Sequence, residues 1–165
     1  MAALKDVIPK LRPFEEELVF EQYIPSKRET VFKFFENANN LEVITPPWLN
    51  FKILDISTKD VQVGTNIKYK LSLYGIPVRW KTLIKDWKKN EMFIDNQEKG
   101  PYERWHHTHE FMDLGPGTLM RDTVILKVPM GALGYVGSWW KVLSDVKMIF
   151  HYRREWIEKN IKSIN

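Results

Sequence analysis

The stretch GYVGSWWKVLSDVKMIFHYRREWIEKNI, residues 134–161, decides the fold. Its apolar residues recur at three- and four-residue spacing, which predicts a single helix of about 25 residues with a wide apolar face. Adjacent tryptophans lie about 100° apart around a helix, so at most one of the pair at 139 and 140 can face the centre. A face this wide needs a sheet to pack against. It is formed by Val136, Trp139, Trp140, Leu143, Val146, Ile149, Phe150, Ile157 and Ile161.

Before this helix the apolar residues follow a period of two, which is typical of strands. In residues 66–74, Ile67, Tyr69 and Leu71 face one way while the intervening lysines face the other. Such alternation predicts an antiparallel sheet with only one face wetted by solvent. The predicted strands are residues 17–24, 50–58, 66–75, 76–87, 91–97, 102–114 and 118–128.

Two short helices are predicted after the first strand. Ser26 and Glu29 have the spacing of a capping box, so the first helix should start near Ser26. Its apolar stripe is Val31, Phe32, Phe35 and Ala38. A shorter helix in residues 39–45 should stop at the two prolines that follow, because proline removes a backbone donor and restricts the preceding residue.

This order of elements predicts an α+β helix-grip fold. A curved antiparallel sheet of about seven strands wraps a long C-terminal helix, and the two short helices plug one end. The whole chain, residues 1–165, is expected to form one domain with a core from about 14 to 162. This arrangement leaves a cavity between the sheet and the long helix.

Composition narrows the classes of function. The chain has no cysteine, which excludes disulfides, thiolate metal sites and thiol catalysis. A net charge of +4 is spread along the sequence without a basic stripe, so no nucleic-acid partner is expected. Without a signal peptide or a long apolar run, the protein is expected to be cytoplasmic.

The richest polar cluster is GPYERWHHTHEF, residues 100–111, which holds three of the 4 histidines. As a strand it turns Trp105, His107, His109 and Phe111 inward. The next strand places Asp122 as a lone acid on its apolar face. A carboxylate there needs a partner, so Asp122 should lie within reach of His107 or His109.

Three interpretations of this cluster stay open at this stage. A structural His-Asp pair could fix the strand register inside the core. The same residues could form the polar end of a ligand pocket. His107, His109 and Asp122 could also make a two-histidine, one-carboxylate metal set, although their spacing alone is weak support. No metal and no cofactor are therefore assigned.

Further inward candidates lie on neighbouring elements. Trp80 should face the cavity, and Gln97 shares a strand face with Phe93 and Asp95, although the opposite phase of that short strand is equally allowed. Arg153 lies on the helix stripe one turn after Phe150. It could clamp a ligand carboxylate or phosphate, or extend to solvent at the helix end.

Two aromatic segments, TPPWLNF at 45–51 and PMGALGYVGSWW at 129–140, are expected in loops or at element ends. They could gate the cavity or make transient contact with a membrane surface. For Trp48, packing under the sheet edge is the favoured interpretation.

The sequence resembles the START-like, or SRPBCC, superfamily, which includes the birch-pollen-allergen fold, lipid-transfer START domains and polyketide cyclases. The similarity runs from about Phe14 to Ile161 and rests on element order and on NLEVITPPWLNFKIL, GIPVRWKTLI and the region from Phe93 to Gly131. It resembles an uncharacterised bacterial branch found beside or fused to sugar-nucleotide epimerase-like domains, which implies an epimerase-like partner. Members hold hydrophobic molecules, and some cyclise or dehydrate them, without a universal catalytic motif.

Together these features predict a protein that binds a hydrophobic or amphipathic molecule, such as a lipid, isoprenoid or polyketide, for carriage or sensing. The cavity should measure roughly 300–1,000 Å³. The predicted ligand contacts are Trp80, Gln97, Trp105, His107, His109, Phe111, Asp122 and Arg153. One alternative is a cyclase or dehydratase with His107, His109 and Asp122 as catalytic candidates. Another is an interaction module without a ligand; a binding protein is favoured over an enzyme.

Overall fold

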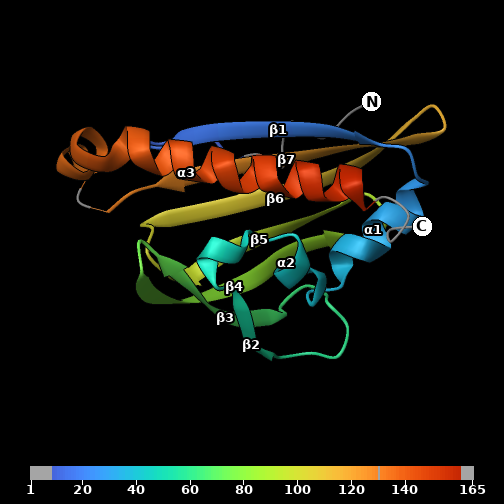
Figure 1. The fold of residues 1–165 in the computed structure, drawn as a ribbon, viewed down its shortest axis with the longest axis horizontal. Helices are drawn as coiled ribbons and strands as arrows, with labels where there is room; N and C mark the ends of the chain where they lie inside the picture. The colour runs from blue at the N-terminus through green and yellow to red at the C-terminus, as the bar shows by residue number, and fades with distance from the viewer. Residues whose placement is uncertain (1–8, 130, 161–165) are drawn as a thin grey trace.

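One antiparallel sheet contains every strand of the described residues (Figure 1). The computed structural model describes residues 9–129 and 131–160, and for residues 131–138 it describes the backbone alone. The strand order is β1-β7-β6-β5-β4-β3-β2, and every pair of neighbours is antiparallel. The seven strands agree with the predicted number. Their bounds are β1 Glu16–Ile24, β2 Lys52–Ile56, β3 Asn66–Leu73, β4 Ile76–Lys88, β5 Met92–Lys99, β6 Arg104–Leu114 and β7 Gly117–Lys127.

The helices complete the predicted helix-grip arrangement. Figure 1 shows the long helix α3, Gly131–Lys159, running along the sheet, with α1, Arg28–Glu36, near its C-terminal end. The short helix α2 spans Asn40–Val43, and one 3₁₀ turn, η1, spans Pro47–Leu49 where a loop was predicted. Within the described part of the chain, no helix has the length and apolarity needed to cross a membrane.

The start of α1 differs from the prediction by one residue. Its N-cap is Lys27, whose side chain makes no capping hydrogen bond, so the capping box expected at Ser26 is wrong. Ser26 is instead buried, and its carbonyl oxygen accepts a 2.7 Å hydrogen bond from Thr118 Oγ1 at the start of β7. The predicted apolar face of α1 is confirmed, because Val31, Phe32, Phe35 and Ala38 are all buried.

Two irregularities interrupt the pairing of β4 with β5, and the second changes which side chains of β4 face inward. Its register against β5 shifts between Lys81 and Thr82 and again between Ile84 and Asp86. Trp80 and Ile84 are both buried on the inner face. After the second shift, Trp87 packs against the apolar cluster that contains Ile84 and against the cluster that contains Phe32 and Phe93. A bulge of this kind bends a strand and increases its twist. The inner wall therefore stays lined with large side chains along a curved strand.

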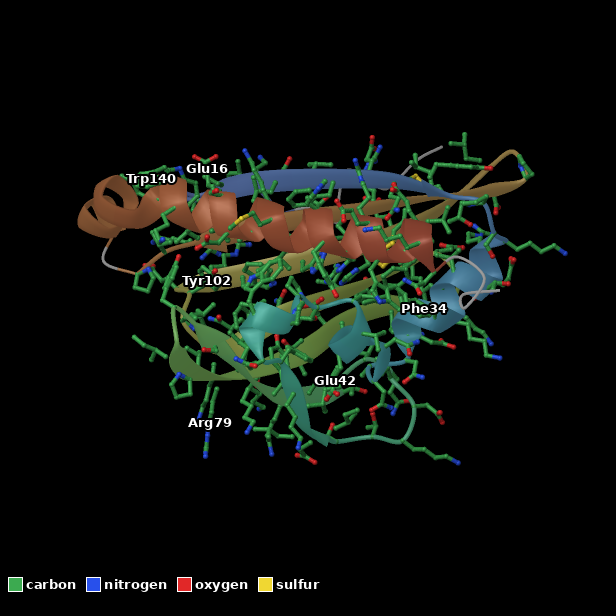
Figure 2. The ribbon with its side chains drawn as sticks, in the orientation of Figure 1. Glu16, Phe34, Glu42, Arg79, Tyr102 and Trp140 are labelled. Atoms are coloured by element: carbon green, nitrogen blue, oxygen red, sulfur yellow. The ribbon has the colours of Figure 1, made fainter. Side chains whose placement is uncertain are left out.

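The apolar face of α3 packs on β1, β6 and β7. The Phe150 ring stacks on Phe20 of β1 with centroids 4.1 Å apart. Of the adjacent tryptophans, Trp139 packs against the core while Trp140 is 71% exposed, in agreement with the limit of one inward ring. Figure 2 shows Trp140 on the outside of α3. The side chains of Val136 and Ile161, also assigned to this face, lie outside the described residues.

The prediction that only one sheet face is dry is wrong for the central strands. The buried side chains of the outer face on these strands are Met92, Ile94, Thr108, Glu110, Thr123 and Ile125. The chain before β1 contributes to this covered face, because the Glu15 carboxylate accepts hydrogen bonds of 2.8 and 2.7 Å from Arg104 of β6. Arg104 points opposite to Trp105, so this ion pair lies on the outer side.

The Glu15 ion pair should stabilise the fold in a pH-dependent way. Burial raises the pKa of Glu15, whose side chain is 1% exposed, but hydrogen bonds from Arg104 and the Arg12 backbone outweigh burial and hold the pKa low. A carboxyl with a lowered pKa contributes stability above its unfolded value, about 4.3, and loses it as pH falls through the folded value. We expect Glu15→Gln to lower the free energy of unfolding by about 1–3 kcal/mol at pH 7.

Urea unfolding of wild type and Glu15→Gln at pH 7 and pH 3 measures this effect, and exposed Glu17→Gln is the control. The difference between wild type and Glu15→Gln should shrink at pH 3. An equal loss at both pH values would contradict the role given to the ionised pair.

Candidate functional site

A cavity of about 160 Å³ lies between the inner face of the sheet and α3. Most of its lining is apolar, and large rings from four different elements enter it, including Tyr69, Trp80, Trp105 and Phe150. These rings occupy space that smaller residues would leave open, so the volume falls below the predicted 300–1,000 Å³. It is close to the roughly 150 Å³ of a cavity that accepts a single benzene ring.

One wall of the cavity is polar. It is formed by Asp95 of β5, His107 and His109 of β6, and Arg153 of α3. The two histidines are two residues apart on β6 and so share its inner face, while Asp95 is the cross-strand neighbour of His107. Their imidazole rings lie 3.7 Å apart between centroids at an interplanar angle of 35°.

A carboxylate lies at each end of this imidazole pair. His107 Nε2 donates to Asp122 Oδ1 at 2.9 Å, and His109 Nε2 donates to Asp95 Oδ2 at 2.8 Å. His109 Nδ1 also lies 2.8 Å from Asp122 Oδ1, but out of line for a hydrogen bond. The expectation that Asp122 lies within reach of His107 or His109 is confirmed for both residues.

Electrostatics divides the charge unequally between the histidines. Burial lowers the pKa of His107, and the neighbouring His109 lowers it further. Burial also acts to lower the pKa of His109, but the close Asp122 carboxylate and the hydrogen bond to Asp95 outweigh it and the pKa is raised. Burial would raise the pKa of both aspartates, yet the histidines hold both values low. A positive charge is therefore more stable on His109 than on His107, and the Arg153 guanidinium adds a second positive group beside Asp122.

Two buried side chains on the cavity wall carry donors that have no acceptor among the described residues. One is Trp80, whose indole Nε1 is unpaired although the residue is only 7% exposed. The other is Arg153, whose Nε and Nη1 atoms are unpaired although Nη1 lies 3.8 Å from Asp122 Oδ2. The Arg153 side chain is 12% exposed and lies over the Phe150 ring, so it does not extend into solvent as one interpretation allowed.

Two predicted ligand contacts do not line the cavity although they face inward. Asp122 lies behind the imidazoles, between β7 and α3, next to Met120 and Ile157. Phe111 packs edge-on against Phe32 of α1 in the adjoining core. Their faces were predicted correctly, but alternation does not report how far along a strand the cavity extends.

Gln97, a third predicted contact outside the cavity lining, has a local structural role instead. Its Nε2 donates to the Tyr102 carbonyl oxygen at 2.6 Å, and its Oε1 accepts from the Tyr102 backbone N–H at 3.3 Å. A Cβ at Gly100 would collide with the same side chain, so a larger residue in this turn between β5 and β6 would displace Gln97 from Tyr102. Figure 2 shows Tyr102, which Gln97 positions, lying beneath α3.

Asp95 is the site residue that the sequence left undecided. The inner phase of β5, with Phe93 and Asp95 facing α3, follows from its pairing with β4 and β6. One signal in the sequence could have identified Asp95. It is an acid in the strand next to the histidine strand, and if it faces inward it needs a buried partner as much as Asp122 does. Tyr69 and Thr82, which share a 3.2 Å hydrogen bond, were also missed as polar wall residues.

The turn η1 lies at the margin of the cavity. Trp48 is 55% exposed and makes an edge contact with Tyr152 of α3 at 5.7 Å between centroids. The favoured packing of Trp48 under the sheet edge is therefore wrong. Its neighbour Leu49 lines the cavity, so this segment connects the wall to an exposed aromatic contact with α3.

Comparison with known families agrees with this architecture. The family model described as polyketide cyclase / dehydrase and lipid transport matches residues 24–159, and the chain belongs to this family. The START-like resemblance is thereby confirmed. No functionally curated protein matches the sequence.

Solved structures share the fold at low sequence identity. The Zhui aromatase/cyclase from Streptomyces sp. R1128 has a TM-score of 0.72 at 11% identity, covering 90% of this chain and 94% of that one. The protein TTHA0849 from Thermus thermophilus has a TM-score of 0.69 at 18% identity, covering 90% and 98%. A START superfamily protein from Mycobacterium smegmatis has 0.68 at 12%, covering 90% and 99%.

Removing the charge of Asp122 should destabilise the protein strongly. Asp122→Asn keeps the side-chain shape but leaves His109 and Arg153 with one buried carboxylate fewer. Breaking a buried charge network in this way costs about 3–5 kcal/mol. Urea unfolding measures the loss. The control is Asp113→Asn, at an exposed acid, which should change stability by no more than about 0.5 kcal/mol.

Equal stability of Asp122→Asn and Asp113→Asn would show that the Asp122 charge does not hold the imidazole pair in place.

Proposed function

We propose that this protein binds a small amphipathic molecule, with an apolar body and an oxygen-bearing end, in the cavity beneath α3 for carriage or sensing. The observation that carries the proposal is a set of buried donor atoms, Trp80 Nε1 and the Nε and Nη1 of Arg153, that form no hydrogen bond among the described residues. Both residues line a cavity whose remaining wall is mainly apolar.

The unpaired donors have an energetic consequence. Leaving a buried donor without an acceptor costs about 1–3 kcal/mol, and more when the donor is charged. A guest that brings a hydroxyl, carbonyl or carboxylate oxygen removes this penalty. The aspartates do not supply the missing acceptor in the geometry described, because Asp95 and Asp122 are directed at the histidines.

The cavity also limits the guest. A space of about 160 Å³ accommodates a body on the scale of one ring. A longer lipid, isoprenoid or polyketide would have to extend beyond this space or displace wall side chains. Polar groups concentrated at one wall of an apolar cavity are the usual form of a small-molecule site.

The family description, with its reference to lipid transport and polyketide cyclases, supports a hydrophobic guest. Neither the family match nor the solved relatives support a membrane contact or an epimerase-like partner, so both are left out of the proposal.

A cyclase or dehydratase is the second candidate, and one observation favours it. Because His107 directs Nε2 at Asp122, its Nδ1 faces the other way, 3.5 Å from Asp95 Oδ2 on the cavity wall. An imidazole oriented by a carboxylate can accept a proton from a bound molecule. The structural likeness to an aromatase/cyclase is compatible with this use of the fold.

Matched probes test the binding proposal. Benzyl alcohol adds one hydroxyl to the ring of toluene, and that oxygen can accept from Trp80 or Arg153. A hydrogen bond involving a charged group contributes about 1.5–3 kcal/mol, so benzyl alcohol should bind at least about 10-fold more tightly than toluene in isothermal titration calorimetry.

Filling the cavity should abolish this binding. Leu71→Trp places a larger ring in the cavity wall, whereas the same change at exposed Leu54 on β2 is the matched control. Probe binding that persists in Leu71→Trp, or no preference for the hydroxyl in wild type, would contradict the proposal. Failure of both probes to bind would favour the interaction-module alternative.

Mass spectrometry separates carriage from catalysis. The molecule extracted from protein purified from its own host is incubated with guest-free wild type and with His107→Ala. A carrier returns it unchanged from both. A dehydratase returns a product lighter by one water from wild type only, and that result would replace carriage with the enzyme.

A further inference from the structure

We propose that Asp95, His107 and His109 bind a divalent transition-metal ion at the polar wall of the cavity, with Asp122 orienting the His107 imidazole from behind. In the sequence, His107, His109 and Asp122 were one possible metal-binding set, but no metal was assigned. In the structure Asp95 replaces Asp122 in this set, because Asp95 lines the cavity with the histidines and Asp122 does not.

The donor atoms converge on the cavity side. One ligand atom from each of Asp95, His107 and His109 lies within 4.8 Å of the other two. Two ligands about 2.1 Å from one tetrahedral ion are roughly 3.4 Å apart. Asp95 Oδ2 lies 3.5 Å from His107 Nδ1 and 2.8 Å from His109 Nε2. The first spacing fits, and the second requires Asp95 to withdraw by about 0.6 Å.

The ring nitrogens that would not bind the metal lie next to Asp122. His107 Nε2 lies 2.9 Å from Asp122 Oδ1, and His109 Nδ1 lies 2.8 Å from the same oxygen. Metal-binding histidines almost always direct their other nitrogen at a carboxylate, carbonyl or water, which fixes the ring and its tautomer. Here Asp122 accepts the hydrogen bond from His107 and lies against His109 Nδ1, so His107 Nδ1 and His109 Nε2 are the nitrogens nearest Asp95.

Charge and access favour a cation at this position. Asp95 faces both imidazoles and Asp122 lies behind them, so a divalent ion between Asp95 and the ring nitrogens pairs with buried carboxylate charge. Nitrogen and oxygen donors of this kind suit Zn²⁺ or Fe²⁺, and three protein ligands leave a coordination position for a guest from the cavity. Entry of the ion requires the rings, now 3.7 Å apart, to separate.

Zinc titration of the full chain after treatment with a chelator tests the site. We expect one equivalent of Zn²⁺ per chain in calorimetry, and at least ~10-fold weaker binding in Asp95→Asn. His106→Ala is the matched control, since His106 is next to His107 in sequence but lies on the other strand face. It should bind as wild type does.

Imidazole ¹⁵N NMR of the wild type keeps the test independent of variant folding. Zn²⁺ should shift His107 Nδ1 and His109 Nε2 and leave the nitrogens of His106 and His151 in place. Absence of binding, full binding by Asp95→Asn, or shifts confined to the exposed His151 and Glu155 pair would overturn the proposal. The outcome is separate from guest binding, which the proposed function assigns to Trp80 and Arg153.

Discussion

Two buried carboxylates, Asp95 and Asp122, hold a stacked pair of imidazoles between them, and this network constrains the centre of the molecule. Charges removed from water are tolerated only when they are paired with good geometry. The pairs join β5 to β6 and β6 to β7, and Arg153 extends the network to α3. The strand register and the position of the long helix are therefore fixed by the same groups that form the polar wall.

Curvature and aromatic packing determine what remains open around that wall. The bulge of β4 between Ile84 and Asp86 puts Trp87 on the same inner face as Trp80, and Phe150 fills the space between β1 and His107. The result is a small cavity with polar groups on one side. In the function proposed here, this combination would select a guest of limited size with an oxygen-bearing end.

Periodicity was enough to predict the fold, because the strand and helix patterns are long and each apolar face needs a partner. The inward direction of His107, His109 and Asp122 followed from the same alternation. Alternation could not decide the phase of β5, which depends on bulges, so Asp95 stayed undecided. It also could not show that Phe111 belongs to the core beneath α1, or that Gln97 is used to close a turn.

The most direct measurement of the central claim is the ¹H–¹⁵N spectrum of the tryptophan indole N–H groups during titration with benzyl alcohol. The account predicts that the Trp80 resonance moves with saturation, because its unpaired N–H gains an acceptor, while exposed Trp140 is unaffected. A Trp80 signal that does not respond, or a response confined to Trp140, would contradict a guest bound at the polar wall.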